Sequence, residues 1–106
     1  MVQSFYHEAI EGCLIMKKAI KMVINGTVQE MFFRNFVKEE ADKLDVKGFI
    51  RNLDNGGIEV FAEGEIENVD NLCEICKTGP KHAKINKISI SESSFQDFKE
   101  FKVLHI

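Results

Sequence analysis

Residues 26–34 read GTVQEMFFR and mark a change from one kind of secondary structure to another. The residues just before, 18–25, alternate between apolar and polar positions, with isoleucine and methionine at the even numbers. A period of two predicts a half-buried strand, which Gly26 would end. From Phe33 the apolar spacing lengthens to that of an amphipathic helix and continues to Leu44. We therefore expect a junction from strand to turn to helix here.

The residues that follow continue to alternate between strand-like and helix-like patterns. An Asp-Asn-Gly-Gly sequence at 54–57 separates two runs of strand character, and Asn-Gly favours a hairpin because both residues tolerate positive φ. Gly79 and Pro80 end a second helical pattern, since glycine adopts a left-handed conformation and proline cannot continue a helix. We expect strands at residues 46–53, 58–63, 85–91 and 102–106, and a second helix whose apolar stripe runs over 69–76.

The elements follow the order βαββαβ, with one further strand at the end of the chain. Right-handed crossovers place both helices of such a unit on one face of a single sheet. We therefore expect an α+β protein with a ferredoxin-like βαββαβ sandwich. In this fold an antiparallel sheet carries two helices on one face, and here it would also carry a terminal fifth strand.

Residues 16–106 are expected to form this one domain, and residues 1–15 an N-terminal extension. Within the extension, Ser4 is a candidate cap for a short helix, along which Phe5, Ala9 and Ile10 align in part. Three roles stay open for these residues: an upstream extension of the chain, an arm that binds a partner, or frayed polypeptide.

Composition excludes several classes of protein. At 106 residues and 44% apolar content the chain is long enough for one packed core. Its formal net charge of −3 has the wrong sign for a surface that collects nucleic-acid phosphates. No apolar run approaches the roughly 20 residues that span a bilayer, and the N-terminus lacks the positive charge of a secretory signal. Three cysteines, an odd number, suit reduced thiols. We expect a cytoplasmic protein with neither nucleic-acid nor membrane partners.

The junction at residues 26–34 suits the binding of an anion. N–H groups of a loop and of a first helical turn, together with the positive end of the helix dipole, form a donor site for oxyanions. Arg34 lies in that first turn, and its planar guanidinium can donate two parallel hydrogen bonds to two phosphate oxygens. An arginine at such a position is more commonly an ordinary surface residue. The neighbouring motifs therefore have to decide between the two interpretations.

Two motifs in this region resemble the signature of the acylphosphatase family, which is approximately G-x-V-Q-G-V-x-F-R followed by G-x-V-x-N. The second motif corresponds to GFIRN at residues 48–52, and Asn52 follows Arg34 by eighteen residues, which is the spacing in the family. The likeness covers about residues 18–106. The residues that match the first motif are Gly26, Val28, Gln29, Phe33 and Arg34.

The resemblance implies hydrolysis of a carboxylic-phosphoric anhydride to a carboxylate and inorganic phosphate. Arg34 would bind the phosphoryl group, and Asn52 would orient the attacking water. Such an enzyme is expected to act as a monomer on a small-molecule acyl phosphate, with no cofactor and no metal. The phosphate-binding residues that the resemblance implies are Gln29, Glu30, Met31, Phe32, Phe33 and Arg34.

Glu30 departs from the family motif, which has glycine at this position. A side chain here adds a carboxylate beside the expected anion and removes the conformational freedom of glycine. The alternative function is therefore a catalytically weak or inactive module that binds phosphate or another anion on the same scaffold and serves in regulation. Whether Glu30 reduces or abolishes turnover stays open from the sequence.

Two other patterns receive structural interpretations. Cys73 and Cys76 form a C-x-x-C sequence, but both fall on the apolar stripe of the second helix, and further ligands at a zinc-like spacing are missing. Phe32, Phe33 and Phe36 could suggest stacking on nucleic-acid bases. The basic and aromatic signature of an RNA-recognition strand is missing, however, so we assign these rings mainly to the helical stripe and the core.

Overall fold

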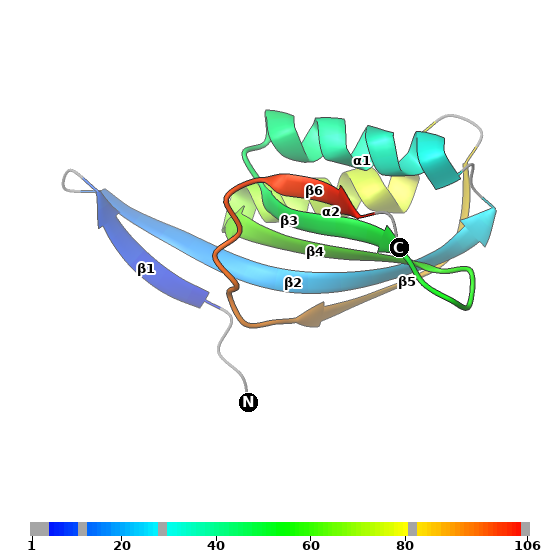
Figure 1. The fold of residues 1–106 in the computed structure, drawn as a ribbon. Coiled ribbons are helices and arrows are strands. Elements are labelled where there is room, and N and C mark those ends of the chain that lie inside the picture. Colours follow the sequence, from blue (N-terminus) through cyan, green and yellow to red (C-terminus); the bar gives the residue numbers. More distant parts are fainter. Residues whose placement is uncertain (1–4, 11–12, 28–29, 81–82, 105–106) are drawn as a thin grey trace.

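The computed structural model describes residues 5–10, 13–27, 30–80 and 83–104. Within them the chain forms one sheet, and both helices cover the same face of it (Figure 1). We call the other side of the sheet the open face. The elements are β1 (Phe5–Ile10), β2 (Cys13–Thr27), α1 (Glu30–Lys43), β3 (Lys47–Asn52), β4 (Ile58–Glu65), α2 (Ile66–Thr78), β5 (Lys84–Glu92) and β6 (Phe101–Leu104).

The sheet has the strand order β1-β2-β4-β3-β6, and β5 pairs with β2. One edge of β2 pairs with β4, and the other edge pairs first with β1 and then, further along, with β5. The segment from β2 to β5 is the expected βαββαβ unit, so the ferredoxin-like α+β fold is confirmed. The terminal strand β6 lies parallel to β3, which makes the sheet mixed rather than wholly antiparallel. This follows because the chain reverses once between β5 and β6, and β5 is antiparallel to β2.

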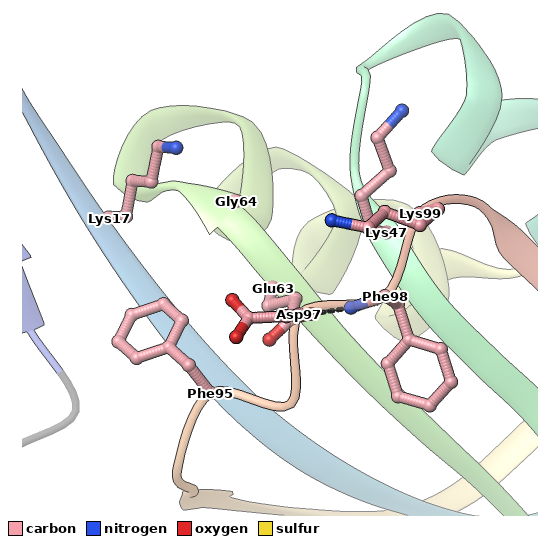
Figure 2. A pocket seen from close by; sticks show the side chains of 8 residues that line it. All are labelled: Lys17, Lys47, Glu63, Gly64, Phe95, Asp97, Phe98 and Lys99. Atoms are coloured by element: carbon pink, nitrogen blue, oxygen red, sulfur yellow. Dashed lines mark hydrogen bonds between the residues drawn. The ribbon is translucent and has the colours of Figure 1, made fainter. Parts of the chain in front are cut away.

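The segment between β5 and β6, residues 93–100, crosses the end of the open face and is called the link here. Its Phe98 ring packs against Phe49 of β3 and Phe61 of β4, with ring centroids 5.6 Å apart in both pairs. The link also closes over a cavity of about 130 Å³ that Lys17, Lys47 and other residues line (Figure 2). Phe61 is therefore buried although it lies on the open face.

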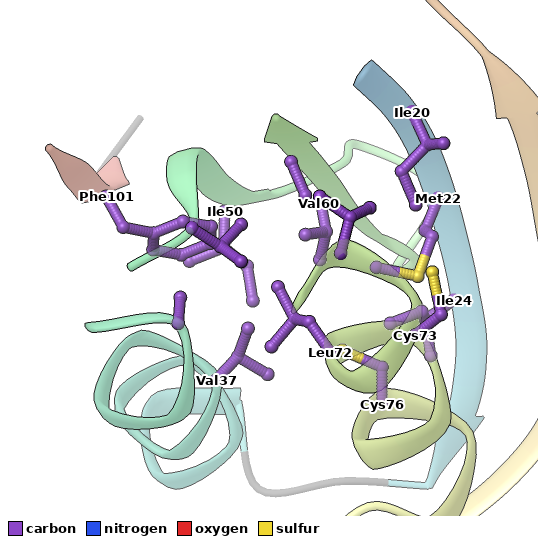
Figure 3. Close-up of a cluster of buried hydrophobic side chains, with 14 of the residues drawn as sticks. Ile20, Met22, Ile24, Val37, Ile50, Val60, Leu72, Cys73, Cys76 and Phe101 are labelled. Atoms are coloured by element: carbon purple, nitrogen blue, oxygen red, sulfur yellow. The ribbon is translucent and has the colours of Figure 1, made fainter. Parts of the chain in front are cut away.

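The core lies between the sheet and the two helices (Figure 3). The 3.6-residue period predicted for both helices is confirmed by the residues that they bury. Apolar burial at this scale contributes roughly 25 cal/mol per Å² removed from water, and these stripes hold the two layers together. The fully or nearly fully buried apolar residues of the helices are Phe33, Val37, Ala41, Val69, Leu72, Cys73 and Cys76.

Cys73 and Cys76 are buried free thiols, as the core interpretation predicted. Burial raises the pKa of the Cys76 thiol to about 12, and burial is also the largest cause that raises the pKa of Cys73. A thiolate is therefore disfavoured at both positions, and these cysteines serve as small apolar core residues. In the described part of the chain, no cluster of three or more His, Cys, Asp or Glu side chains could hold a metal ion.

The N-terminal residues differ from the short helix that was expected. Residues Phe5–Ile10 form strand β1, which pairs antiparallel with the first part of β2, so the helix prediction was wrong. Its proposed cap, Ser4, lies outside the described residues. So short an isolated helix is marginal in water, whereas pairing with β2 provides partners for the backbone N–H and C=O groups of the strand. Strand β2 runs continuously past residues 15 and 16, where the domain boundary was placed.

The predicted hairpin between β3 and β4 is confirmed by their antiparallel pairing. Its turn uses positive φ at Gly56 rather than at both Asn55 and Gly56, and the side chain of Asn55 accepts a hydrogen bond of 2.9 Å from the Gly57 N–H. Among the helices that the described residues form, none is long and apolar enough to cross a membrane.

Candidate active site

The C-terminal ends of β2 and β3 lie at the same end of the sheet. Ile24 of β2 and Asn52 of β3 both pair with Ile58 of β4, so they occupy one row across three strands. Helix α1 begins only a few residues after β2 ends, and it starts from this end of the sheet (Figure 1). The fold therefore brings the junction at residues 26–34 to the end of the sheet where Asn52 lies.

Arg34 lies one turn into α1 and is only 7% exposed. Its Nη1 donates a long hydrogen bond of 3.4 Å to the carbonyl oxygen of Leu104, and Leu104 pairs with Arg51, the residue before Asn52. The guanidinium thus lies beside the C-terminal ends of β3 and β6. A buried cation with this placement does not fit the alternative of an ordinary surface arginine.

Asn52 is the last residue of β3 and is half-buried. Side chains alternate along a strand, so Asn52 shares the helix-covered face with Ile50, which is fully buried. Asn52 Oδ1 and Arg34 Nε are both shielded from solvent. An amide and a guanidinium are thereby present on the same side of the sheet and at the same end of it.

The start of α1 provides N–H groups as well as a positive dipole end. A helix that begins at Glu30 leaves the N–H groups of Glu30, Met31 and Phe32 without an acceptor in the helix. Such groups, in the field of the helix dipole, can bind an oxyanion without help from any side chain. Of the other residues predicted to bind phosphate, Gln29 lies outside the described part of the chain.

The aromatic residues of the first turn separate into two environments. Phe33 is completely buried in the core, as predicted, and Phe36 packs against the core while partly buried. Phe32 is 58% exposed, so its assignment to the core was wrong. Successive residues of a helix point about 100° apart, and the core stripe passes through Phe33 rather than through its neighbour.

At two positions of the motifs, the structure explains why the residue is glycine. A Cβ at Gly26 would overlap the carbonyl oxygen of Lys84, where β2 and β5 shift register. Gly48 has φ of +143°, and a Cβ there would overlap the carbonyl oxygen of Phe61 in the neighbouring strand. These glycines allow close approach of main chains, which places the end of β2 and the whole of β3.

Sequence reasoning did not find the carbonyl of Leu104 beside Arg34. The two residues are 70 positions apart, and a main-chain carbonyl leaves no mark in a sequence. The parallel pairing of β6 with β3 brings them together.

The family model described as Acylphosphatase matches residues 20–103 of the chain. An acylphosphatase of Acaryochloris marina is 39% identical over 85 residues, which cover 80% of this chain and 91% of that relative. The chain belongs to the acylphosphatase family. Arg34 and Asn52 both lie inside the matched region.

Solved structures of acylphosphatases have the same fold. An acylphosphatase from Coxiella burnetii superposes with a TM-score of 0.78 at 31% identity, covering 83% of this chain and 93% of that one. The crystal structure of acylphosphatase from Bacillus subtilis gives a TM-score of 0.77 at 33% identity, with coverages of 82% and 98%. The acylphosphatase fold therefore accounts for β2 to β6 together with both helices.

Proposed function

We propose that this protein hydrolyses acyl phosphates to a carboxylate and inorganic phosphate. The observation that carries the proposal is the buried guanidinium of Arg34, which lies beside the N-terminal turn of α1 and the end of β3. Family membership supports the same reaction in general.

In the proposed complex, main-chain N–H groups between Gln29 and Arg34 hold the phosphoryl oxygens. The Arg34 side chain adds a planar pair of donors that match two of these oxygens. Charge on the phosphoryl oxygens is then met by fixed donors that need little rearrangement during the reaction. The N–H groups of Glu30 to Phe32 support this arrangement because they have no acceptor within the helix.

Asn52 is proposed to orient the attacking water through its amide oxygen. The leaving carboxylate has a conjugate acid of pKa about 4, so it departs without a general acid. The proton of the water can pass to a phosphate oxygen of the substrate itself. A positioned water, fixed N–H donors and one guanidinium are then sufficient for the reaction, and no histidine, metal or cofactor is required.

The alternative is a noncatalytic module that binds phosphate or another anion and serves in regulation. One observation favours it: Glu30 stands in place of the glycine of the family motif, at the residue where α1 begins. The two functions differ in turnover and not in phosphate binding.

The first prediction concerns release of phosphate from a simple aromatic acyl phosphate. The wild-type protein should release it, and Arg34→Ala and Asn52→Ala should each lower kcat/KM by about 100-fold or more, the usual effect of removing a transition-state donor. Arg34→Ala should also abolish binding of orthophosphate. Asn52→Ala should retain binding and lose kcat.

Arg51→Ala is the matched control. Arg51 precedes Asn52, lies on the open face and pairs with Glu59 at 2.7 Å, so its removal should leave turnover near that of the wild type. Wild-type protein that binds orthophosphate and releases none from substrate would support the noncatalytic alternative. An active Asn52→Ala variant would exclude the proposed role of Asn52.

We further propose that the protein acts as a cytoplasmic monomer on a small-molecule acyl phosphate, without nucleic-acid or membrane partners. The net charge of −3 and the free thiols of Cys73 and Cys76 support this proposal.

A further inference from the structure

Glu63 is a buried carboxylate at the opposite end of the sheet from Arg34. It lies on the open face of β4, is 5% exposed, and forms part of the wall of the cavity under the link. Its Oε1 accepts a hydrogen bond of 2.9 Å from the Gln96 N–H. Its Oε2 accepts one of 2.6 Å from the Phe98 N–H (Figure 2). Hydrogen bonds to an ionised acceptor are roughly twice as strong as neutral ones.

These two bonds hold the middle of the link. Asp97, which lies between the two donor residues, has φ of +57°, a conformation that non-glycine residues adopt only when their surroundings require it. Hydrogen bonds also fix both ends, from Ser93 N–H to the Ala19 carbonyl at 3.0 Å and from Gly48 N–H to the Glu100 carbonyl at 3.1 Å. The carboxylate of Glu63 is therefore the central anchor of the segment that leads into β6.

The register of β6 decides where the Leu104 carbonyl lies. In the observed register Phe101 pairs with Gly48 and Leu104 with Arg51, which buries Phe101 and places the Leu104 carbonyl beside Arg34. A slip by one residue would move that carbonyl by about 3.3 Å along β3. The same slip would turn Phe101 from the core to the open face.

We propose that Glu63 is a positioning residue for Arg34: by clamping the link it fixes the register of β6, and the end of β6 then orients the guanidinium. The importance of that orientation for catalysis rests on the proposed function. The positioning itself can be measured without turnover.

The test is Glu63→Gln in the full chain. The glutamine keeps the size of the side chain and one acceptor, but its NH₂ group opposes a main-chain N–H donor. Because Arg34 Nε is shielded from solvent, its Nε–H resonance should be observable by NMR. We expect this resonance to shift or broaden, and the affinity for orthophosphate to fall about tenfold.

Leu72→Val serves as the control, because it loosens the core under α2 and not the link. It should lower stability without altering the Arg34 resonance. If Glu63→Gln does not fold, Phe98→Leu replaces it, since this change weakens the ring contacts of the link and leaves the carboxylate in place.

The proposal is overturned if the amide resonances of Gln96 and Phe98 in the link shift while the Arg34 Nε–H resonance stays unchanged and the orthophosphate affinity stays within twofold of the wild type. Wild-type protein that binds no orthophosphate contradicts the proposed function instead. The Arg34 resonance would still decide the role of Glu63 in that case.

Discussion

Glu30 combines two electrostatic effects at the start of α1. Glu30 is the first helical residue, where the backbone has a conformation that any L-residue adopts, and an acidic residue in a first helical turn generally stabilises a helix by about 0.3–1 kcal/mol. A carboxylate near the proposed oxyanion would also repel it. At about 8 Å a dianion and a single charge interact by about 1 kcal/mol in water, which is roughly fivefold in affinity. Glu30→Gly should therefore raise orthophosphate affinity by about that factor and lower stability by about 1–2 kcal/mol.

Glu30→Gln separates charge from backbone freedom. If repulsion is the cause, the glutamine variant should gain nearly the same affinity as the glycine variant in an orthophosphate titration. Gain in the glycine variant alone would indicate that the loop needs backbone freedom at this position. If both variants keep the affinity and activity of the wild type, the chain already accommodates Glu30.

Gly48 is needed for the close approach of β3 to β4. Gly48→Ala should lower the free energy of unfolding by about 2–4 kcal/mol, because the new Cβ meets the Phe61 carbonyl and φ becomes unfavourable. Gly56→Ala is the control, since Gly56 also has positive φ but has open space around it, and it should cost only about 1–2 kcal/mol. Urea denaturation measures both, and equal losses would contradict the role of close approach.

Strand β1 and the start of β2 form a two-stranded arm that projects beyond the helices (Figure 1). In the described residues β1 contacts β2 and no other element, and an isolated hairpin of this kind is marginally stable in water. The junction proposed to bind phosphate follows the opposite end of β2. Deleting residues 1–12 should therefore change stability by less than about 1 kcal/mol and orthophosphate affinity by less than about twofold.

Calorimetry and an orthophosphate titration of the truncated chain check this prediction. A loss of several kcal/mol would mean that the arm stabilises the domain. A tenfold change in affinity would mean that the arm acts on the distant junction, although it cannot cover it in this fold.

At the level of elements, the periodic segments were predictable because each buries one continuous face. The apolar stripe through Phe33 and Val37 predicted that α1 is a helix. The alternation through Ile20 and Met22 predicted which face of β2 is buried. The strand at Phe5–Ile10 was not predictable, because its conformation depends on pairing with β2 and not on its own pattern. The parallel placement of β6 likewise depends on the route of the link.

At the scale of the whole molecule, the candidate site was predictable to the extent that it is carried by side chains. Arg34 and Asn52 were named from their motif spacing, and the fold brings them to one end of the sheet. The Leu104 carbonyl and the clamp formed by Glu63 were not found. Both depend on contacts between residues far apart in the sequence, and the partner groups are main-chain atoms.

The direction of β6 also guides how the protein should be labelled. Because β6 runs parallel to β3, a tag or fluorescent reporter attached at the C-terminal side of β6 would follow Leu104 next to the Arg34 guanidinium and crowd the proposed phosphate site. A fusion placed before β1 would begin opposite Lys18, nine residues along β2 from Thr27, which is about 30 Å from the junction. Immobilisation for binding assays should therefore use the N-terminal side.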